Sequence, residues 1–157
     1  MSNERKPHWS AEEIAALPER KHQHQFNAKA IRHTRSIGEL TGLSRIGIHL
    51  IRLETGSDST TFHYHDADEE FIYVVSGRGI AEIGEERIEV GAGDFMGFTA
   101  PSPAHNLHNP YPEDLVYLVG GERNASDLVH YPRIRRTLIK SNGKRSWVDW
   151  DDVTDLN

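Results

Sequence analysis

The chain has 157 residues, a formal net charge of -6 and no cysteine. Its length predicts a single domain, and the lack of cysteine excludes both a disulfide framework and a Cys-rich zinc module. The acidic balance argues against nucleic-acid binding. No apolar run reaches the roughly 18 residues of a membrane span, and the N-terminus lacks the apolar core of a signal peptide, so we expect no membrane partner and a cytoplasmic protein.

Residues 1–40 are predicted to be an N-terminal extension with a short helix and an edge segment. Ser10 and Glu13 have the spacing of a capping box, which indicates a helix that stops at Pro18. Further along, His22 and His24 repeat with one residue between them, but no strand pattern or glycine frames them. We interpret this segment as solvated chain.

Residues 41–122 carry the signals of β-structure. Short runs rich in β-branched and aromatic residues alternate with Gly-rich turns. The predicted strands or hairpins cover residues 43–56, 60–65, 70–77, 79–94, 95–98 and 113–122. Many short strands at regular spacing predict an all-β sandwich or barrel.

Residues 123–157 are predicted to be a C-terminal extension. Basic residues cluster between Arg133 and Arg145, and an acidic segment with Trp147 and Trp150 follows. A nucleic-acid arm would carry the basic run without the acidic one. We therefore expect two solvated faces together with an edge strand or a subunit contact.

The segment around His63 and His65 is the main candidate for a functional site. Residues i and i+2 of a strand face the same side, so these two imidazoles project together. Glu70 can join them if the polar residues 66–69 reset the strand register. His105 supplies a third imidazole, whereas His108 points away from it.

Three imidazoles and one carboxylate suit one divalent ion of Fe, Mn, Ni, Co or Zn and leave one or two coordination positions open. His63, His65, Glu70 and His105 are therefore the predicted metal ligands. The alternative is that the two strand histidines are a wet strand face and that the acidic residues form a solubilising turn. Glu69 is a competing carboxylate, and we expect it to be exposed together with Asp68.

Other residues have two interpretations each. His49 is either a fourth imidazole in the same interior or a hydrogen-bonded strand residue. Several aromatic residues either line a substrate pocket or belong to the core: Tyr73, Tyr117, Phe95 and Phe98. A substrate-anchoring arginine could come from Arg45, Arg52, Arg78 or Arg87, which all lie on or near predicted strands.

The segment from Gly56 to Gly77 resembles the first motif of the cupin superfamily, G-x5-H-x-H-x3or4-E-x6-G. His63, His65, Glu70 and Gly77 match in order, although six residues instead of five separate Gly56 from His63. Residues 93–109 resemble the second motif, with His105 and Asn109 at the expected separation. In that motif, Ala100 and Ser102 replace the usual Pro and Gly.

The resemblance implies a double-stranded β-helix, or jelly-roll barrel, with His63, His65, Glu70 and His105 as metal ligands. It is strongest to small, single-domain bacterial cupins of unassigned activity. It implies a metal-dependent enzyme acting on a small polar molecule by dioxygenase-type or isomerase-type chemistry, or alternatively a non-catalytic small-molecule binding or sensor protein. Cupins of this size are commonly dimers, so we expect a homodimer with the N-terminal segment or the Trp147–Trp150 tail in its interface.

Overall fold

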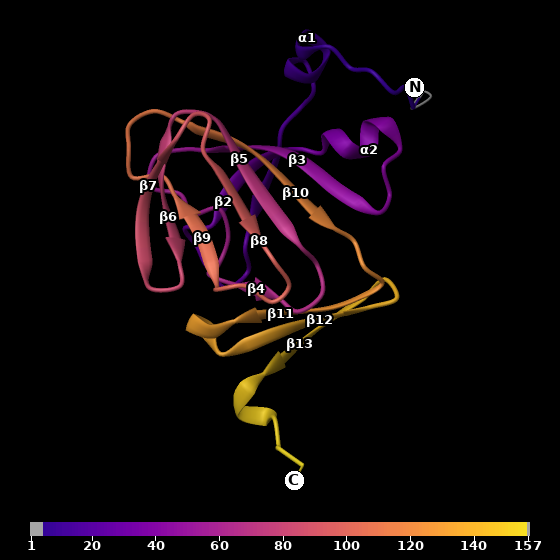
Figure 1. The fold of residues 1–157 in the computed structure, drawn as a ribbon, viewed down its shortest axis with the longest axis vertical. Helices are drawn as coiled ribbons and strands as arrows, with labels where there is room; N and C mark the ends of the chain where they lie inside the picture. The colour runs from indigo at the N-terminus through magenta and orange to yellow at the C-terminus, as the bar shows by residue number, and fades with distance from the viewer. Residues whose placement is uncertain (1–4, 157) are drawn as a thin grey trace.

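The protein is an all-β barrel with short additions at both ends, as Figure 1 shows for the computed structural model, which describes residues 5–156. Its strands form three antiparallel sheets with the orders β1-β2-β3-β10-β5-β8, β7-β6-β9 and β13-β12-β11-β4. The strands are β1 (Arg20–Gln23), β2 (Ile31–Arg35), β3 (Ile46–Leu53), β4 (Tyr64–His65), β5 (Glu70–Ser76), β6 (Arg78–Ile83), β7 (Glu86–Gly91), β8 (Phe95–Phe98), β9 (His105–His108), β10 (Leu115–Glu122), β11 (Ser126–Tyr131), β12 (Arg136–Ser141) and β13 (Lys144–Asp149). The expected jelly-roll barrel is confirmed.

Local sequence explains the short helices. Helix α1 (Ala11–Ala15) begins where predicted, because the Ser10 hydroxyl accepts from Glu13 N and the Glu13 carboxylate accepts from Ser10 N. Helix α2 (Ile37–Thr41) ends at Gly42, which adopts the left-handed conformation, and was not predicted. Two 3-10 turns, η1 (Pro132–Ile134) and η2 (Trp150–Asp152), lie in the C-terminal region.

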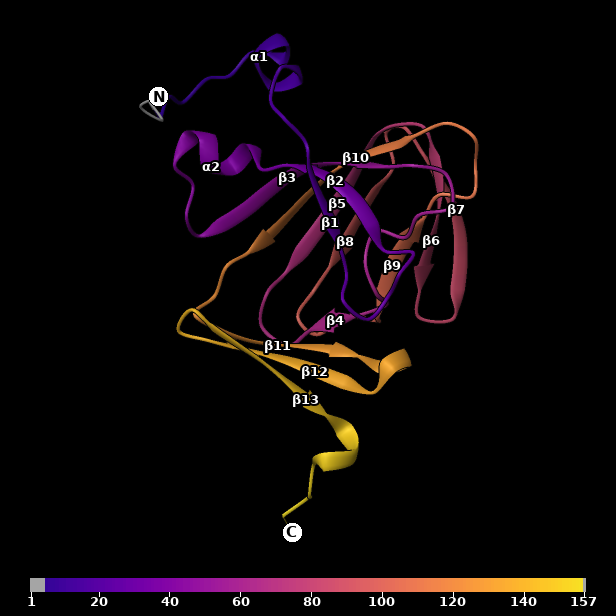
Figure 2. The same cartoon turned by 180° about the vertical axis from the view of Figure 1, so that it is seen from behind.

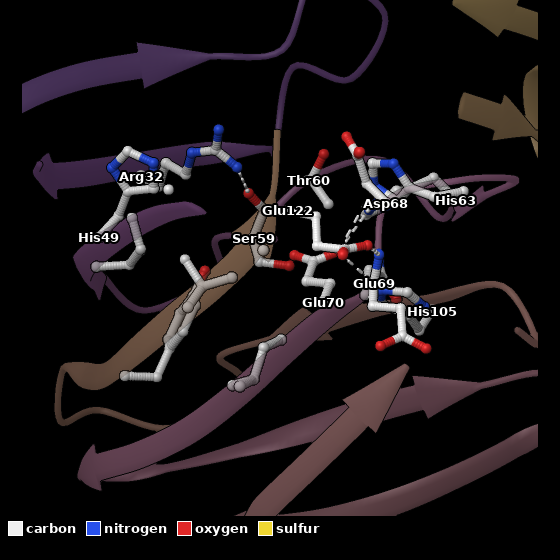
Figure 3. A pocket seen from close by; sticks show the side chains of 18 of the residues that line it. Arg32, His49, Ser59, Thr60, His63, Asp68, Glu69, Glu70, His105 and Glu122 are labelled. Atoms are coloured by element: carbon white, nitrogen blue, oxygen red, sulfur yellow. Dashed lines mark hydrogen bonds and ion pairs between the residues drawn. The ribbon is translucent and has the colours of Figure 1, made fainter. Parts of the chain in front are cut away.

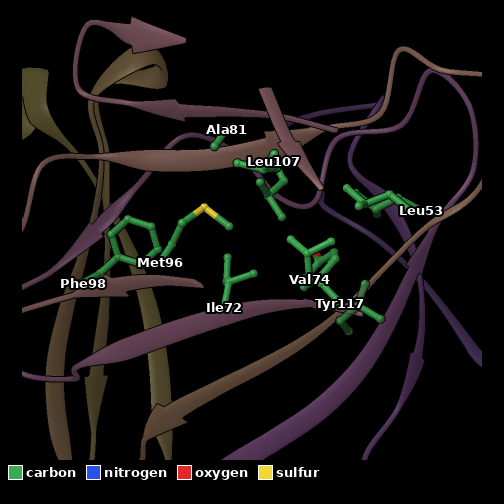
Figure 4. Packing of buried hydrophobic residues seen from close by; sticks show 11 residues of the cluster. Leu53, Ile72, Val74, Ala81, Met96, Phe98, Leu107 and Tyr117 are labelled. Carbon is green, nitrogen blue, oxygen red and sulfur yellow. The ribbon is translucent and has the colours of Figure 1, made fainter. Parts of the chain in front are cut away.

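The hydrophobic core lies between the six-stranded sheet and the three-stranded sheet β7-β6-β9 (Figure 4). Alternate residues of β5 and β10 point inward, as the period of a strand requires, and Val74, Leu115 and Tyr117 are almost completely buried. Leu107 of β9 and Ala81 of β6 meet them from the opposite sheet. This packing fixes which ends of the strands meet at the site.

The C-terminal residues form the third sheet, which lies across one end of the barrel in both views (Figures 1 and 2). Strand β11 pairs with β4 of the barrel, and β12 and β13 extend the sheet outward. Val129, Tyr131 and Leu138 form a small core of their own, against which Trp147 packs. The predicted edge strand is thus a hairpin and a third strand, and Trp147 contacts its own chain.

The N-terminal residues also join the barrel, because β1 and β2 extend the sheet of β3. His24 does not lie in solvated chain as expected. Its ring is half-buried and lies 5.3 Å from Tyr131 and 6.0 Å from Trp147, measured between ring centroids. Within residues 5–156, no helix is long and apolar enough to cross a membrane.

Candidate metal centre

The four predicted ligands meet at one end of the barrel. His63 immediately precedes β4, His65 ends β4, Glu70 begins β5 and His105 begins β9. A β-bridge joins His63 to His105, so the two chain segments lie side by side. Glu70 Oε2 lies 3.6 Å from Nε2 of His63, 3.6 Å from Nε2 of His65 and 3.4 Å from Nε2 of His105.

Each imidazole uses its other nitrogen, Nδ1, for a second contact. His63 Nδ1 lies 2.9 Å from Thr61 O, and His105 Nδ1 lies 3.2 Å from Pro103 O. A carbonyl oxygen only accepts, so both Nδ1 atoms carry the proton. In the neutral rings, the lone pair of Nε2 therefore faces the Glu70 carboxylate.

His65 is held by a carboxylate instead of a carbonyl. Its Nδ1 lies 2.7 Å from Asp127 Oδ2, and the Asp127 side chain has no exposed surface. Burial acts to raise the pKa of Asp127, but Lys140 and His65 outweigh burial and lower it. Burial and the neighbouring His63 lower the pKa of His65, which keeps its Nε2 unprotonated.

Phe98 fixes the plane of the His105 ring. It stacks on His105 with 3.5 Å between ring centroids and an angle of 4° between the planes. All three imidazoles are therefore oriented before any ligand binds, in the way that outer-shell partners orient the ligands of a metal.

This arrangement of acceptor groups fits a cation. Three nitrogen lone pairs and a carboxylate converge, and either a cation or added protons must separate them. When protons instead of a cation separate these groups, burial acts to raise the pKa of the Glu70 carboxylate. The His105 and His63 imidazoles outweigh burial and hold this pKa well below its usual value. Metal–ligand bonds of about 2.1 Å put neighbouring ligand atoms about 3.0 to 3.4 Å apart, close to the three separations from Glu70 Oε2. The ligand atoms of His63, Glu70 and His105 all lie within 4.8 Å of one another, whereas His65 groups with Asp68 and Asp127.

A second acidic cluster beside this one is occupied by an ammonium group. Asp68, Asp127 and His65 lie close enough to hold an ion, but Lys140 Nζ lies 2.5 Å from Asp68 Oδ2 and 2.9 Å from Asp127 Oδ2. Burial acts to lower the pKa of Lys140, yet the two carboxylates outweigh burial and raise it. Asp68 is only 4% exposed, so the expectation that it is exposed was wrong: its charge is paired with Lys140.

The four groups open onto a cavity of about 250 Å³, shown in Figure 3. Glu69 and Glu122 line it near Glu70, and Glu69 is exposed as expected. His49 of β3 also lines the cavity, and its Nδ1 lies 3.0 Å from Ser36 Oγ. His108 lies outside the cavity lining, and its Nδ1 is 2.7 Å from Asp58 Oδ1.

The aromatic candidates separate into two groups. Tyr117 is buried and lines the cavity, and Phe98 is buried against His105. Tyr73 and Phe95 belong neither to the core nor to this cavity, because they pair on the outer face of β5 and β8 and are exposed.

The cationic residues of the cavity were missed by sequence analysis. Arg32, Arg123 and Lys140 line it, whereas none of Arg45, Arg52, Arg78 and Arg87 does. The arginines of the cavity come from β2 and from the residue after β10, and Lys140 comes from β12. No local sequence signal distinguishes these three residues, because the pairing of β2 with β3 is known only from the structure.

Comparisons with known proteins agree with the fold. Residues 49–121 match the family model described as "Cupin domain". A "putative sugar phosphate isomerase" from Acidithiobacillus ferrooxidans is 37% identical, with 95% of this chain and 96% of that chain covered and a TM-score of 0.91. No curated protein sequence matches the chain.

Two more distant structures share the fold. A "sugar phosphate isomerase from a cupin superfamily" from Silicibacter pomeroyi is 24% identical over 96% of this chain and 97% of that chain, with a TM-score of 0.82. A "predicted oxalate decarboxylase" from Thermotoga maritima is 18% identical over 71% of this chain and 96% of that chain, with a TM-score of 0.60. With its two motifs, its barrel, its match to the cupin family model and its similarity to a relative along almost the whole chain, this chain belongs to the cupin superfamily.

Proposed function

We propose that the protein is a metal-dependent isomerase that interconverts the aldose and ketose forms of a small phosphorylated sugar. The observation that carries the proposal is the convergence of three Nε2 atoms on Glu70 Oε2 at the wall of a cavity lined mainly by polar and charged residues. The similarity of the whole chain to the "putative sugar phosphate isomerase" supports this substrate class.

The proposed ligands are His63, His65, Glu70 and His105, and the ion is one of Fe, Mn, Ni, Co or Zn. Such an ion supplies Lewis acidity, which polarises a carbonyl oxygen and favours loss of a proton from the neighbouring carbon. His63, His65 and His105 present Nε2 lone pairs, and their Nδ1 contacts keep the rings in place.

Isomerisation is a proton shift, so it needs a base and no oxidant. We assign this role to Glu122, which lines the cavity near Glu70. Its Oε2 accepts from Glu69 N at 3.0 Å, which orients the carboxylate. Glu122 would take the proton from the carbon beside the carbonyl and return it to the former carbonyl carbon, while the hydroxyl proton passes to the former carbonyl oxygen. His49 is not assigned this role, because it lies two strands away from Glu70.

The test uses metal-free protein loaded separately with Fe(II), Mn(II), Ni(II), Co(II) or Zn(II). Each form is mixed with phosphorylated aldoses and ketoses of three to six carbons in D2O, and NMR follows both isomer formation and deuterium incorporation. We expect both with at least one ion, and loss of turnover in Glu122→Gln. His108→Gln is the control, because His108 lies outside the cavity.

Three results would count against the proposal. Neither product nor deuterium incorporation with any ion, alongside tight stoichiometric binding of a small molecule, would favour the binding or sensor function. Consumption of O2 by the Fe(II) form would favour a dioxygenase. Full turnover by Glu122→Gln would remove that residue as the base.

A further inference from the structure

The wall of the cavity farthest from Glu70 differs from the metal centre in the side chains that form it. Glu70, Gly121 and Gly47 pair side by side on β5, β10 and β3. Strands lie about 4.8 Å apart, so Gly47 is about 10 Å from Glu70 along this row. Neither glycine carries a side chain, and the floor between the two positions is therefore open.

Two arginines stand at this far wall. Arg32 and His49 lie together on one side of the cavity in Figure 3, opposite His63, Glu70 and His105. Arg32 Nη1 donates to Ser59 O at 3.2 Å, whereas its Nε is buried and has no partner among the described residues. A buried N–H group without an acceptor is unfavourable, so a ligand that accepts from it would be stabilised.

Arg123 lines the same cavity and lies beside His49. Its guanidinium lies over Gly47, where a Cβ atom would be 2.9 Å from Arg123 Nε and 3.2 Å from His49 Nε2. Glycine at position 47 therefore allows the guanidinium and the imidazole to meet. Arg123 Nη2 also donates to Glu39 Oε1 at 3.0 Å, an exposed contact that leaves its other donors available.

His49 adds a neutral donor between the two cations. Burial first, and then the charges of Arg123 and Arg32, lower its pKa, so the ring is neutral near pH 7. In the tautomer in which Ser36 Oγ donates to Nδ1, the proton lies on Nε2, beside Arg123.

We propose that Arg32, His49 and Arg123 form a phosphoryl-binding subsite at the end of the cavity opposite the metal centre. Guanidinium groups bind phosphate oxygens through two parallel N–H donors. The carboxylates of Glu69, Glu70 and Glu122 line the other end and repel a phosphate there. The subsite therefore orients a phosphorylated substrate with its uncharged end at the metal; this role in turnover rests on the proposed function, whereas phosphate binding itself does not.

The test titrates inorganic phosphate into metal-free protein by isothermal calorimetry. We expect one site per chain, and a dissociation constant at least about tenfold higher in Arg32→Gln and in Arg123→Gln, since each removes charge-assisted hydrogen bonds. Gly47→Ala should weaken binding too, because its methyl group would displace Arg123. The matched control is Arg87→Gln, which removes the same charge from an exposed side chain bound to Glu82.

The subsite would be overturned by absent phosphate binding, by unchanged affinity in both arginine variants, or by an equal loss in Arg87→Gln. If Arg32→Gln fails to fold by circular dichroism, Arg123→Gln decides the outcome. Glu70→Gln separates the two proposals, because it should abolish isomerase activity and leave phosphate affinity unchanged. Isomerase activity without phosphate binding would overturn the subsite alone, and phosphate binding without activity in any metal form would overturn the proposed function alone.

Discussion

His63, His65 and His105 each direct Nε2 towards Glu70, because Nδ1 is held by a backbone carbonyl or by Asp127. At this scale the site depends on single atoms: a carboxylate oxygen among three lone pairs binds a cation, and an amide does so more weakly. Glu69 is adjacent in sequence but exposed, which makes it a matched control.

Glu70→Gln should lower metal affinity by at least about 100-fold, since loss of a ligand exceeds the loss of an outer-shell partner. Competition titration with a chelator, together with elemental analysis of tag-free protein, measures this. Glu69→Gln should bind metal as the wild type does. Equal losses in both variants would show that general acidity, not the Glu70 carboxylate, holds the ion.

Asp127→Asn should lower metal affinity by about 10-fold to 100-fold, because an amide can no longer fix His65 as a carboxylate does. The variant also leaves Lys140 with Asp68 alone, so folding must be checked by thermal unfolding before titration. Asp66→Asn is the control, since Asp66 pairs with His130 at the surface. Unchanged affinity in a folded Asp127→Asn would contradict a positioning role.

At the scale of elements, the two glycines that frame the first motif have different roles. Gly77 joins β5 to β6 with a φ of 78°, and a Cβ atom there would lie 2.2 Å from Asp114 O. Gly56 has a φ of 80°, and nothing lies within 4 Å of its Cβ position. Both turns need the left-handed conformation, but only the first also needs the space.

Gly77→Ala should therefore destabilise the protein more than Gly56→Ala. The left-handed conformation alone costs about 1–2 kcal/mol in each variant, and the backbone clash adds to this only at position 77. Urea denaturation of the two metal-free variants measures the difference. Equal free energies of unfolding would mean that the β5–β6 turn shifts without cost.

The contact between β1 and the C-terminal sheet should depend on pH through His24. Burial lowers the pKa of His24 from 6.5 to about 4, so the unfolded chain binds the proton more readily than the folded one. Its contribution is complete above pH 6.5 and is lost as the pH falls towards 4. After allowance for partial exposure, the loss is on the order of 1 kcal/mol.

His24→Gln, which does not titrate, should lose less stability than the wild type between pH 7 and pH 5. Urea denaturation of metal-free protein at each pH gives the two slopes. His8→Gln is the control, because His8 is exposed. A slope in His24→Gln as steep as in the wild type would contradict the assignment.

At the scale of the whole molecule, an apolar area remains on the outer face of the barrel. Tyr73, Val75 and Phe95 are exposed there, Phe95 by 65%, and Phe71 stacks near Phe95. The sequence-based expectation of a homodimer stays a prediction, and its proposed location changes. Trp147 and Trp150 pack within their own chain, and Trp150 Nε1 donates to Thr137 Oγ1 at 2.8 Å.

We propose that a homodimer buries the face of Phe95. Phe95→Asp should then give a monomer by light scattering at micromolar concentration, since it would bury a charge in an apolar contact. Leu156→Asp, in the exposed C-terminal tail, should remain a dimer. A monomeric wild type would remove the homodimer, and a monomeric Leu156→Asp would return the interface to the tail.

The sequence by itself determined the barrel and the four candidate ligands. Strand alternation placed His63 and His65 on one face, and the resemblance of the Glu70-to-Gly77 spacing to the first cupin motif selected this carboxylate over Glu69. These signals are local, because a strand has a period of two residues and a turn has its own glycine. These signals can therefore be recognised in the sequence without knowledge of distant contacts.

Only the tertiary structure decided what surrounds these ligands. Asp127 and Lys140 lie more than 60 positions after His65, and Arg32 lies more than 30 before it. In sequence, each resembles a solvated charge, because a charged side chain is buried only where a partner compensates it. Those partners come into contact only when β2, β4 and β12 assemble at the same end of the barrel, and no local sequence pattern predicts these contacts.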